Sequence, residues 1–311
     1  MKPFLFLNVI PNLSSLFGKW SIILPLLILS YEMKAQTYRT QQNQLLAYNI
    51  ISNGLMGGIG GMINKPKEVK WHKAFLNNFG KGCLGGLVKY SAKRNTRYQA
   101  NENFNFLALP NRLFFFAGHS MVMNAALNKK VFDTYYLNLY GADIRYQRKD
   151  NNKPPFHVKL SLMSVVSFVD FTIQKHTFDL YRSLEMGIFY FDMDPDYQLD
   201  GVLVDGIAGN NTIGIKKHSN QWTVSNVIPH EIVHVYQVYD FFPITNIYYS
   251  EYLEKPLSKY GFYTKLQKYM AFDFDAAYFS AAYLFQPVPA HYKNFFEFEA
   301  EHFSSRNYIK R

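Results

Sequence analysis

The sequence predicts an α+β fold in three parts: a hydrophobic, glycine-rich helical region, an antiparallel β-sheet in the middle, and a helical C-terminal part. Three observations predict it. Hydrophobic segments containing glycine lie at residues 45–64 and 75–90, within the first 130 of the 311 residues. Apolar residues then alternate with polar ones, as in strands, and they return to helical spacing from about residue 224. We therefore divide the chain into residues 1–35, which precede the fold, residues 36–130, which form the helical region, and residues 131–311, which contain both the sheet and the helical C-terminal part.

The first 35 residues are expected to be a signal peptide. Lys19 precedes the compact apolar run SIILPLLILS at residues 21–30, and Ala35 offers the small residue that signal peptidase requires. Because charged residues next to the cut are atypical, an uncleaved N-terminal anchor is the alternative. Both a cleaved signal peptide and an uncleaved anchor predict an exported protein, in the periplasm or associated with a membrane of the cell envelope.

Residues 36–130 are expected to form hydrophobic, glycine-rich helices that are candidates for membrane association. Leu45–Asn64 has the length of a membrane-crossing helix and no formal charge, and its glycines four residues apart would allow another helix to approach closely. Asn49 and Asn53 oppose insertion, so a helix packed inside the protein is the alternative. Phe75–Tyr90 has the same character and is the candidate packing partner.

Residues 131–223 are expected to form the sheet. Tyr135, Leu137 and Leu139 alternate with more polar neighbours, and Val158, Leu160 and Leu162 do the same. Further strand-like runs are 168–174, 178–184 and 186–191. Short strands joined by short turns, such as the turn at residues 150–154, predict antiparallel pairing.

The net charge of +10 does not by itself indicate a partner, because its meaning depends on where the charged residues lie in the sequence. Lysines and arginines occur in small groups that flank apolar segments, which is typical of contact with an anionic membrane surface and also of ordinary solubilising charge. No recognised nucleic-acid-binding motif accompanies them, so we expect no nucleic-acid partner. The single cysteine, Cys83, excludes an intramolecular disulfide and a metal site built mainly from thiolates.

The sequence HEIVH at residues 230–234 is the most informative motif of the chain. On a helix, His230 and His234 project from the same face one turn apart, so that both can bind one metal ion. Glu231 lies beside them and is placed to take a proton from a metal-bound water as a general base.

The residues around the motif predict an amphipathic helix. Ser225 or Asn226 can cap its start, and Pro229 would then fall in the first turn, where a missing amide hydrogen costs little. Its apolar stripe consists of Ile228, Ile232, Val235 and Tyr239.

The string HEIVHVYQ resembles the HExxHxxQ variant of the gluzincin class of zinc metallopeptidases, whose third zinc ligand is a glutamate on a later helix. Residues 297–301, EFEAE, are similar to the ExxA(D/E) pattern that carries this glutamate in the class, including its membrane-embedded CAAX prenyl peptidase family. The resemblance implies a zincin-like C-terminal part with Glu297 as the ligand and Glu301 as the acid that orients a histidine.

The resemblance covers only two short segments, and other assignments stay open. Glu299 is the second candidate for the third ligand, and His302 is another. Gln237 faces the same side as the two histidines and could form a hydrogen bond next to the metal ligands, or it is exposed to solvent. His291 and Tyr292 are candidates for stabilising an oxyanion, or are packed or exposed aromatic residues.

These observations predict a zinc-dependent metallopeptidase of the cell envelope that hydrolyses amide bonds with a metal-activated water. It would hold one Zn²⁺ per chain and act on a peptide or protein substrate, with a membrane surface as a candidate partner. The alternative is a non-enzymatic envelope protein with a structural or vestigial zinc site. A fully membrane-embedded protease is the third hypothesis and requires at least two membrane-crossing segments.

Overall fold

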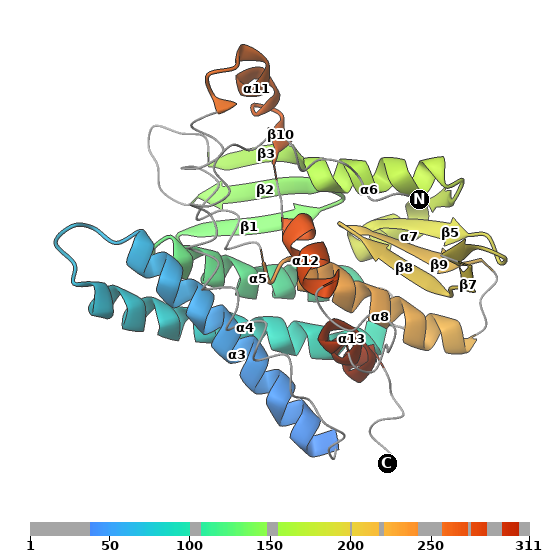
Figure 1. The fold of residues 1–311 in the computed structure, drawn as a ribbon, viewed down its shortest axis with the longest axis horizontal. Helices are drawn as coiled ribbons and strands as arrows, with labels where there is room; N and C mark the ends of the chain where they lie inside the picture. Colours follow the sequence, from blue (N-terminus) through green and yellow to red (C-terminus); the bar gives the residue numbers. More distant parts are fainter. Residues whose placement is uncertain are drawn as a thin grey trace.

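A computed structural model describes residues 38–99, 107–147, 155–199, 201–217, 221–241, 257–272, 275–284 and 294–304. Within these residues the fold is a mixture of helices and small sheets, in the chain order that Figure 1 shows by colour. The expected signal peptide, the turn at residues 150–154, and His291 and Tyr292 lie outside the described residues.

Three long helices lie in the region expected to be helical: α3 (Tyr38–Ile63), α4 (Trp71–Gln99) and α5 (Ala108–Ala126). Helices α3 and α4 pack side by side (Figure 1), as expected for the two glycine-bearing segments. At their crossing a Cβ added to Gly54 would lie 2.6 Å from Cys83 Sγ, and one added to Gly82 would lie 3.0 Å from Gly54 Cα. Both glycines are needed for this close approach. No helix in the described residues is long and apolar enough to cross a lipid bilayer.

The first sheet lies on α5 and contains the first predicted strands. Its order is β1 (Thr134–Leu139), β2 (Ala142–Gln147), β3 (Phe156–Ser161) and β10 (Met270–Ala271). The pairs β1–β2 and β2–β3 are antiparallel, whereas β10 joins β3 in parallel. Ser120 of α5 fixes β1 in place, because its Oγ accepts a hydrogen bond of 2.9 Å from the Tyr136 amide.

The second sheet is mixed, so the expectation of purely antiparallel pairing is wrong. Its order is β4 (Thr177–Asp179), β5 (Phe189–Met193), β9 (Thr212–Lys216) and β8 (Gly206–Gly209). Strands β5 and β9 are parallel because the chain between them leaves the sheet, forms the hairpin β6 (Gln198–Leu199) and β7 (Val202–Leu203), and returns through β8. Strand β8 then lies at the sheet edge, antiparallel to β9.

Two segments expected to be strands are helices instead. Residues 168–174 belong mostly to α6 (Leu162–Ile173), and residues 178–184 belong mostly to α7 (Leu180–Met186). Each helix has an N-cap that the apolar pattern does not reveal. The Ser161 side chain accepts a hydrogen bond from the Ser164 amide at 3.0 Å, and Asp179 accepts one from the Arg182 amide at 2.9 Å.

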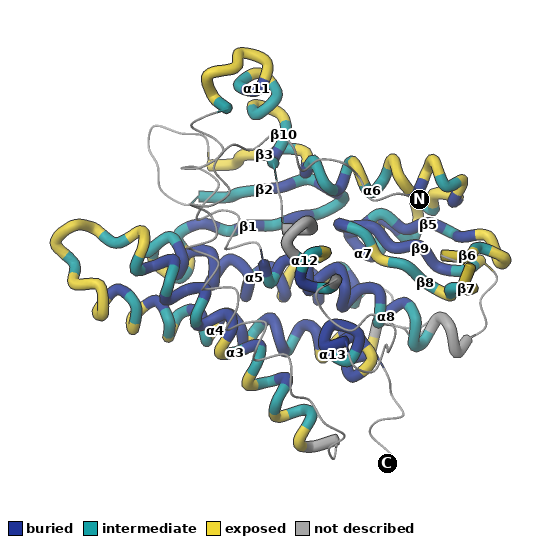
Figure 2. Tube along the Cα trace, viewed as in Figure 1, coloured by how far each residue is buried: buried dark blue, intermediate teal, exposed yellow. Residues whose placement is uncertain are grey.

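The described residues after 220 are mostly helical, as expected: α8 (Gln221–Val238), α11 (Gly261–Leu266), α12 (Asp275–Leu284) and α13 (Phe295–Ser304). Helix α8 begins at Gln221, so the predicted cap at Ser225 or Asn226 is wrong and Pro229 lies inside the helix. Figure 2 shows that the most buried parts of the chain include α5, α8, α13, β5 and β9, and α8 lies between two apolar clusters.

Candidate metal centre

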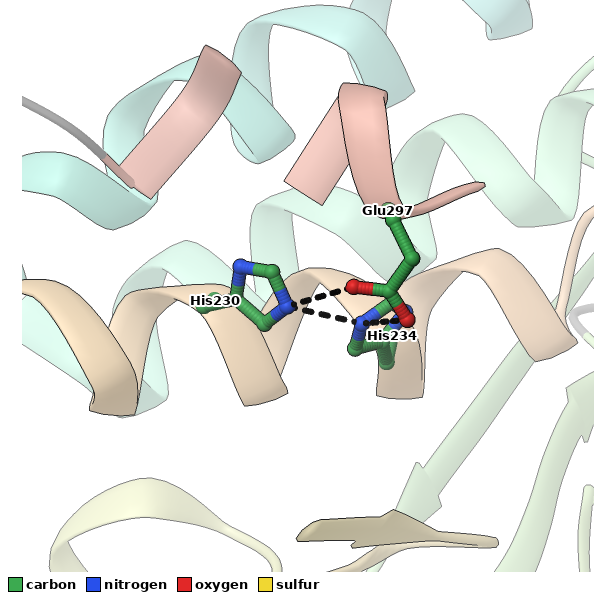
Figure 3. Close-up of side chains that lie close together, drawn as sticks. All are labelled: His230, His234 and Glu297. Atoms are coloured by element: carbon green, nitrogen blue, oxygen red, sulfur yellow. Dashed lines mark hydrogen bonds and ion pairs between the residues drawn. The ribbon is translucent and has the colours of Figure 1, made fainter. Parts of the chain in front are cut away.

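Two helices bring the three predicted ligands together. His230 and His234 lie one turn apart on α8, and Glu297 reaches them from the first turn of α13 (Figure 3). The Nε2 atoms of the two histidines are 3.0 Å apart, and the Glu297 carboxylate oxygens lie 3.1 Å from His230 Nε2 and 3.5 Å from His234 Nε2. These donor atoms lie within 4.8 Å of one another and could hold a metal ion.

Apolar contacts between α8 and α13 hold these side chains in place. Val233 of α8 and Phe296, Ala300 and Phe303 of α13 belong to one buried cluster. Because Val233 and His234 are neighbours on α8, and Phe296 and Glu297 are neighbours on α13, packing of the two helices fixes the distance between the ligands.

His234 and Glu297 shift the pKa of each other. Burial alone would lower the pKa of His234, but the Glu297 carboxylate raises it to about 9. Burial alone would raise the pKa of Glu297, but hydrogen bonds and charge from both histidines hold it well below its usual range. In the metal-free protein at neutral pH, His234 is therefore protonated and faces an ionised Glu297.

Tyr283 of α12 contacts the same carboxylate. Its hydroxyl donates a hydrogen bond of 2.5 Å to Glu297 Oε1. Burial and this contact raise the pKa of Tyr283, so it stays protonated and remains a donor. The sequence analysis missed Tyr283, because it is one of 24 tyrosines and no motif surrounds it.

The side chain of Glu231 contacts β8, the edge strand of the second sheet. It is 6% exposed, and its charge raises the pKa of both His234 and Tyr283. A Cβ added to Gly206 of β8 would lie 2.8 Å from Glu231 Oε1 and 2.9 Å from its Cγ. The strand can pass this close to Glu231 only because residue 206 is glycine.

The two other carboxylates of α13 differ in their surroundings. Glu299 is fully buried and faces away from the histidines, toward Lys93 of α4, which lies 3.0 Å from its Oε2. Glu301 is 56% exposed, and its Oε2 lies 3.9 Å from His230 Nδ1, which is too long for a hydrogen bond. Of these two carboxylates, Glu299 is therefore the one linked to a histidine by hydrogen bonds, through Gln237.

Gln237 contacts a candidate ligand directly. Its Oε1 lies 2.8 Å from His234 Nδ1, and its Nε2 donates 2.9 Å hydrogen bonds to the Phe296 carbonyl and to Glu299 Oε2. His302 is buried on α13 but is not one of the three grouped side chains. Burial and the nearby Arg97 lower the pKa of His302 to about 4.

Comparison with known proteins gives no match: no family model, no curated protein and no solved structure is significantly similar to this chain.

Proposed function

We propose that this chain is a zinc-dependent metallopeptidase. One observation carries the proposal: His230, His234 and Glu297 meet in a partly buried group, with Glu231 of the same HExxH motif beside them. Two imidazoles and one carboxylate are the protein ligands of many catalytic zinc sites, which keep a further position for water or substrate.

The spacing of the donor atoms fits zinc. Two ligand atoms, each about 2.0–2.1 Å from a tetrahedral ion, are about 3.3 Å apart. The two histidine Nε2 atoms are 3.0 Å apart and Glu297 Oε2 lies 3.1 Å from His230 Nε2, close to that value. The 3.5 Å contact of His234 Nε2 is with the other carboxylate oxygen, Oε1. His234 also has a hydrogen-bond partner on its other ring nitrogen, which is typical of histidines that bind a metal.

The remaining side chains have separate roles in the proposed reaction. When bound, zinc would act as a Lewis acid and lower the pKa of a water molecule. Glu231 would accept the proton of the attacking water and pass it to the leaving amine. Tyr283 would orient Glu297 through its hydroxyl, because that contact fixes one of the two carboxylate oxygens.

The edge strand β8 favours a peptide as the substrate. It is the outermost strand of its sheet, and its first residue, Gly206, lies against Glu231. An extended peptide that paired with this edge would have its backbone next to the proposed base, and backbone pairing does not depend on the peptide side chains.

The test measures zinc and hydrolysis in the purified full chain. We expect one zinc per chain and cleavage of a mixed peptide library. The Glu231→Gln variant should keep the zinc and lose activity by about 10²- to 10⁴-fold, because a general base contributes about that much. Glu68→Gln, an exposed change in the α3–α4 turn, is the control.

The outcomes separate the candidate functions. A wild-type chain without zinc would contradict the proposal, and full activity of Glu231→Gln would remove its base. Zinc without turnover in the wild type would favour a non-enzymatic protein with a structural or vestigial site. The cell-envelope location is part of the proposal and depends on residues 1–35; the N-terminal residue of the protein recovered from the envelope fraction tests it.

A further inference from the structure

Four charged side chains form a buried cluster next to the proposed zinc site, and the proposed reaction does not use them. Lys89 and Lys93 of α4 are fully buried, as is Glu299 of α13, and the side chain of Asp240, which follows α8, is 10% exposed. Lys93 Nζ lies 2.7 Å from Asp240 Oδ2 and 3.0 Å from Glu299 Oε2, and Lys89 Nζ lies 2.5 Å from Asp240 Oδ1. The two positive and two negative charges balance.

A buried ionic cluster of this kind contributes little to stability. Removing four charges from water is costly, and apolar side chains of similar volume would hold the helices together at least as well. The cluster therefore calls for another explanation, and its contacts with Gln237 provide one.

The hydrogen bonds of Glu299 fix the position of its carboxylate. Oε1 accepts from Asn49 Nδ2 of α3 at 2.7 Å and from Lys93 Nζ at 3.1 Å. Oε2 accepts from Lys93 Nζ at 3.0 Å and from Gln237 Nε2 at 2.9 Å. Both oxygens are thus held by side chains of α3, α4 and α8.

This arrangement fixes the direction of the next hydrogen bond. Gln237 Nε2 faces two groups that can only accept, the Phe296 carbonyl and the Glu299 carboxylate, so the amide cannot be rotated by 180° without losing both bonds. Gln237 Oε1 must then face His234 and accept a hydrogen bond from Nδ1. When His234 is neutral, the lone pair of its Nε2 is then directed toward His230 and Glu297.

We infer that Lys93 and Glu299 are positioning residues of the metal site: they hold Gln237 so that His234 binds metal through Nε2. The inference rests on the proposed function, since it assumes that the site binds zinc. The inference also makes α4 part of the metal site, because Lys93 holds Glu299 although the two residues are 206 positions apart in the sequence.

The first test removes the amide that connects the cluster to the histidine. We expect Gln237→Met to weaken zinc binding by roughly 10- to 100-fold, the usual effect of losing a hydrogen-bond partner of a metal ligand. Zinc affinity is measured by competition with a chelator. In the zinc-loaded chain with ¹⁵N-labelled histidine, the His234 Nδ1–H signal should exchange faster with solvent in the variant.

Asn124→Leu is the matched control. Asn124 is a fully buried amide of α5 whose Nδ2 donates to two carbonyls, at 2.9 Å to Val131 and 2.8 Å to Thr134, so it resembles Gln237 without contacting a ligand. This variant should lower the stability of the metal-free protein and leave zinc affinity unchanged. A purely structural role of Gln237 predicts that both variants behave alike.

The second test changes the cluster itself. Glu299→Gln should weaken zinc binding in the same direction as Gln237→Met but less, because the Phe296 carbonyl still holds Gln237. The double variant Lys93→Met with Glu299→Met replaces the central pair by apolar side chains and should fold even if the single variant does not. Its zinc affinity should also be reduced.

Each outcome decides between the claims. If the wild type binds zinc and these variants bind it equally well, with an unchanged Nδ1–H signal, the positioning role is wrong and the proposed function stands. If only Gln237→Met weakens binding, Gln237 acts without Lys93 and Glu299, and the inference is overturned. A wild type that binds no zinc overturns both.

Discussion

The two faces of α8 differ in what they contribute. One face carries Ile228, Ile232 and Tyr236, which lie in a buried apolar cluster with α5 and β9. The other carries His230, His234 and Gln237, which meet polar and charged side chains of α13. The apolar face stabilises the fold by about 1.5–3 kcal/mol per buried side chain. The polar face requires buried charges that add little stability, and it carries the two histidines of the proposed metal site.

The largest expected effect comes from breaking the polar face. His234→Ala should abolish stoichiometric zinc binding, because it removes one of three ligands. The metal-free variant should stay folded and lose about 1–3 kcal/mol of unfolding free energy, because a buried partner of Glu297 is lost while the apolar face is intact. Metal analysis after dialysis and urea unfolding measure the two effects. Collapse of the fold would contradict the division between the faces.

The next largest effect comes from breaking the apolar face. Tyr236 is 1% exposed, and its ring stacks on Phe115 with the centroids 4.1 Å apart and the planes within 8°. Tyr236→Ala should lower the free energy of unfolding by about 3–5 kcal/mol, as for other large aromatic residues in cores. The folded fraction should bind zinc with wild-type affinity. A change in zinc affinity measured under stabilising conditions would show that the faces are coupled.

A change of pH should alter zinc binding at the polar face of α8 without any mutation. The pKa of His234 is raised to about 9 in the metal-free protein, so below that pH zinc must displace a proton. Zinc affinity should rise about tenfold per pH unit, hence about 100-fold from pH 7 to 9, and then level off. Chelator competition at several pH values measures the slope. A flat profile would contradict the assignment.

The stability of the metal-free protein should change in the opposite direction. Because the pKa of His234 is raised on folding from about 6.5, its contribution is fully present below pH 6.5 and is lost as the pH rises through about 9. Urea unfolding of the metal-free chain over this range tests the sign. Tyr236→Ala should be less stable at each pH but should show the same pH dependence.

The sequence was most informative where a local pattern decides the structure. The HExxH spacing placed His230 and His234 on one helix face, and the apolar stripe of that helix is buried as expected, at Ile228, Ile232, Val235 and Tyr239. Glu297 came from a resemblance between short motifs, and the structure places it next to both histidines.

The sequence was least informative where the decisive partner is distant or the apolar run is short. The strand predicted at residues 168–174 is wrong, because a short apolar run fits both the strand and the helix period. The helix is set by the N-cap at Ser161, a polar residue outside that run. The Lys93–Glu299 pair has no sequence pattern, since its members lie on helices that meet only in the folded chain. Pro229 predicted a helix start and lies inside α8.

The distance in sequence between α8 and α13 affects when the site can form. Glu297 follows His230 by 67 residues, and the contacts that hold Glu299 reach back to α3 and α4. A ribosome-bound chain that has been extended only through α8 contains the HExxH motif but not its third ligand. The proposed peptidase activity would therefore begin only after Glu297 has been synthesised and α13 has docked, which would protect the nascent chain from the proposed hydrolytic site.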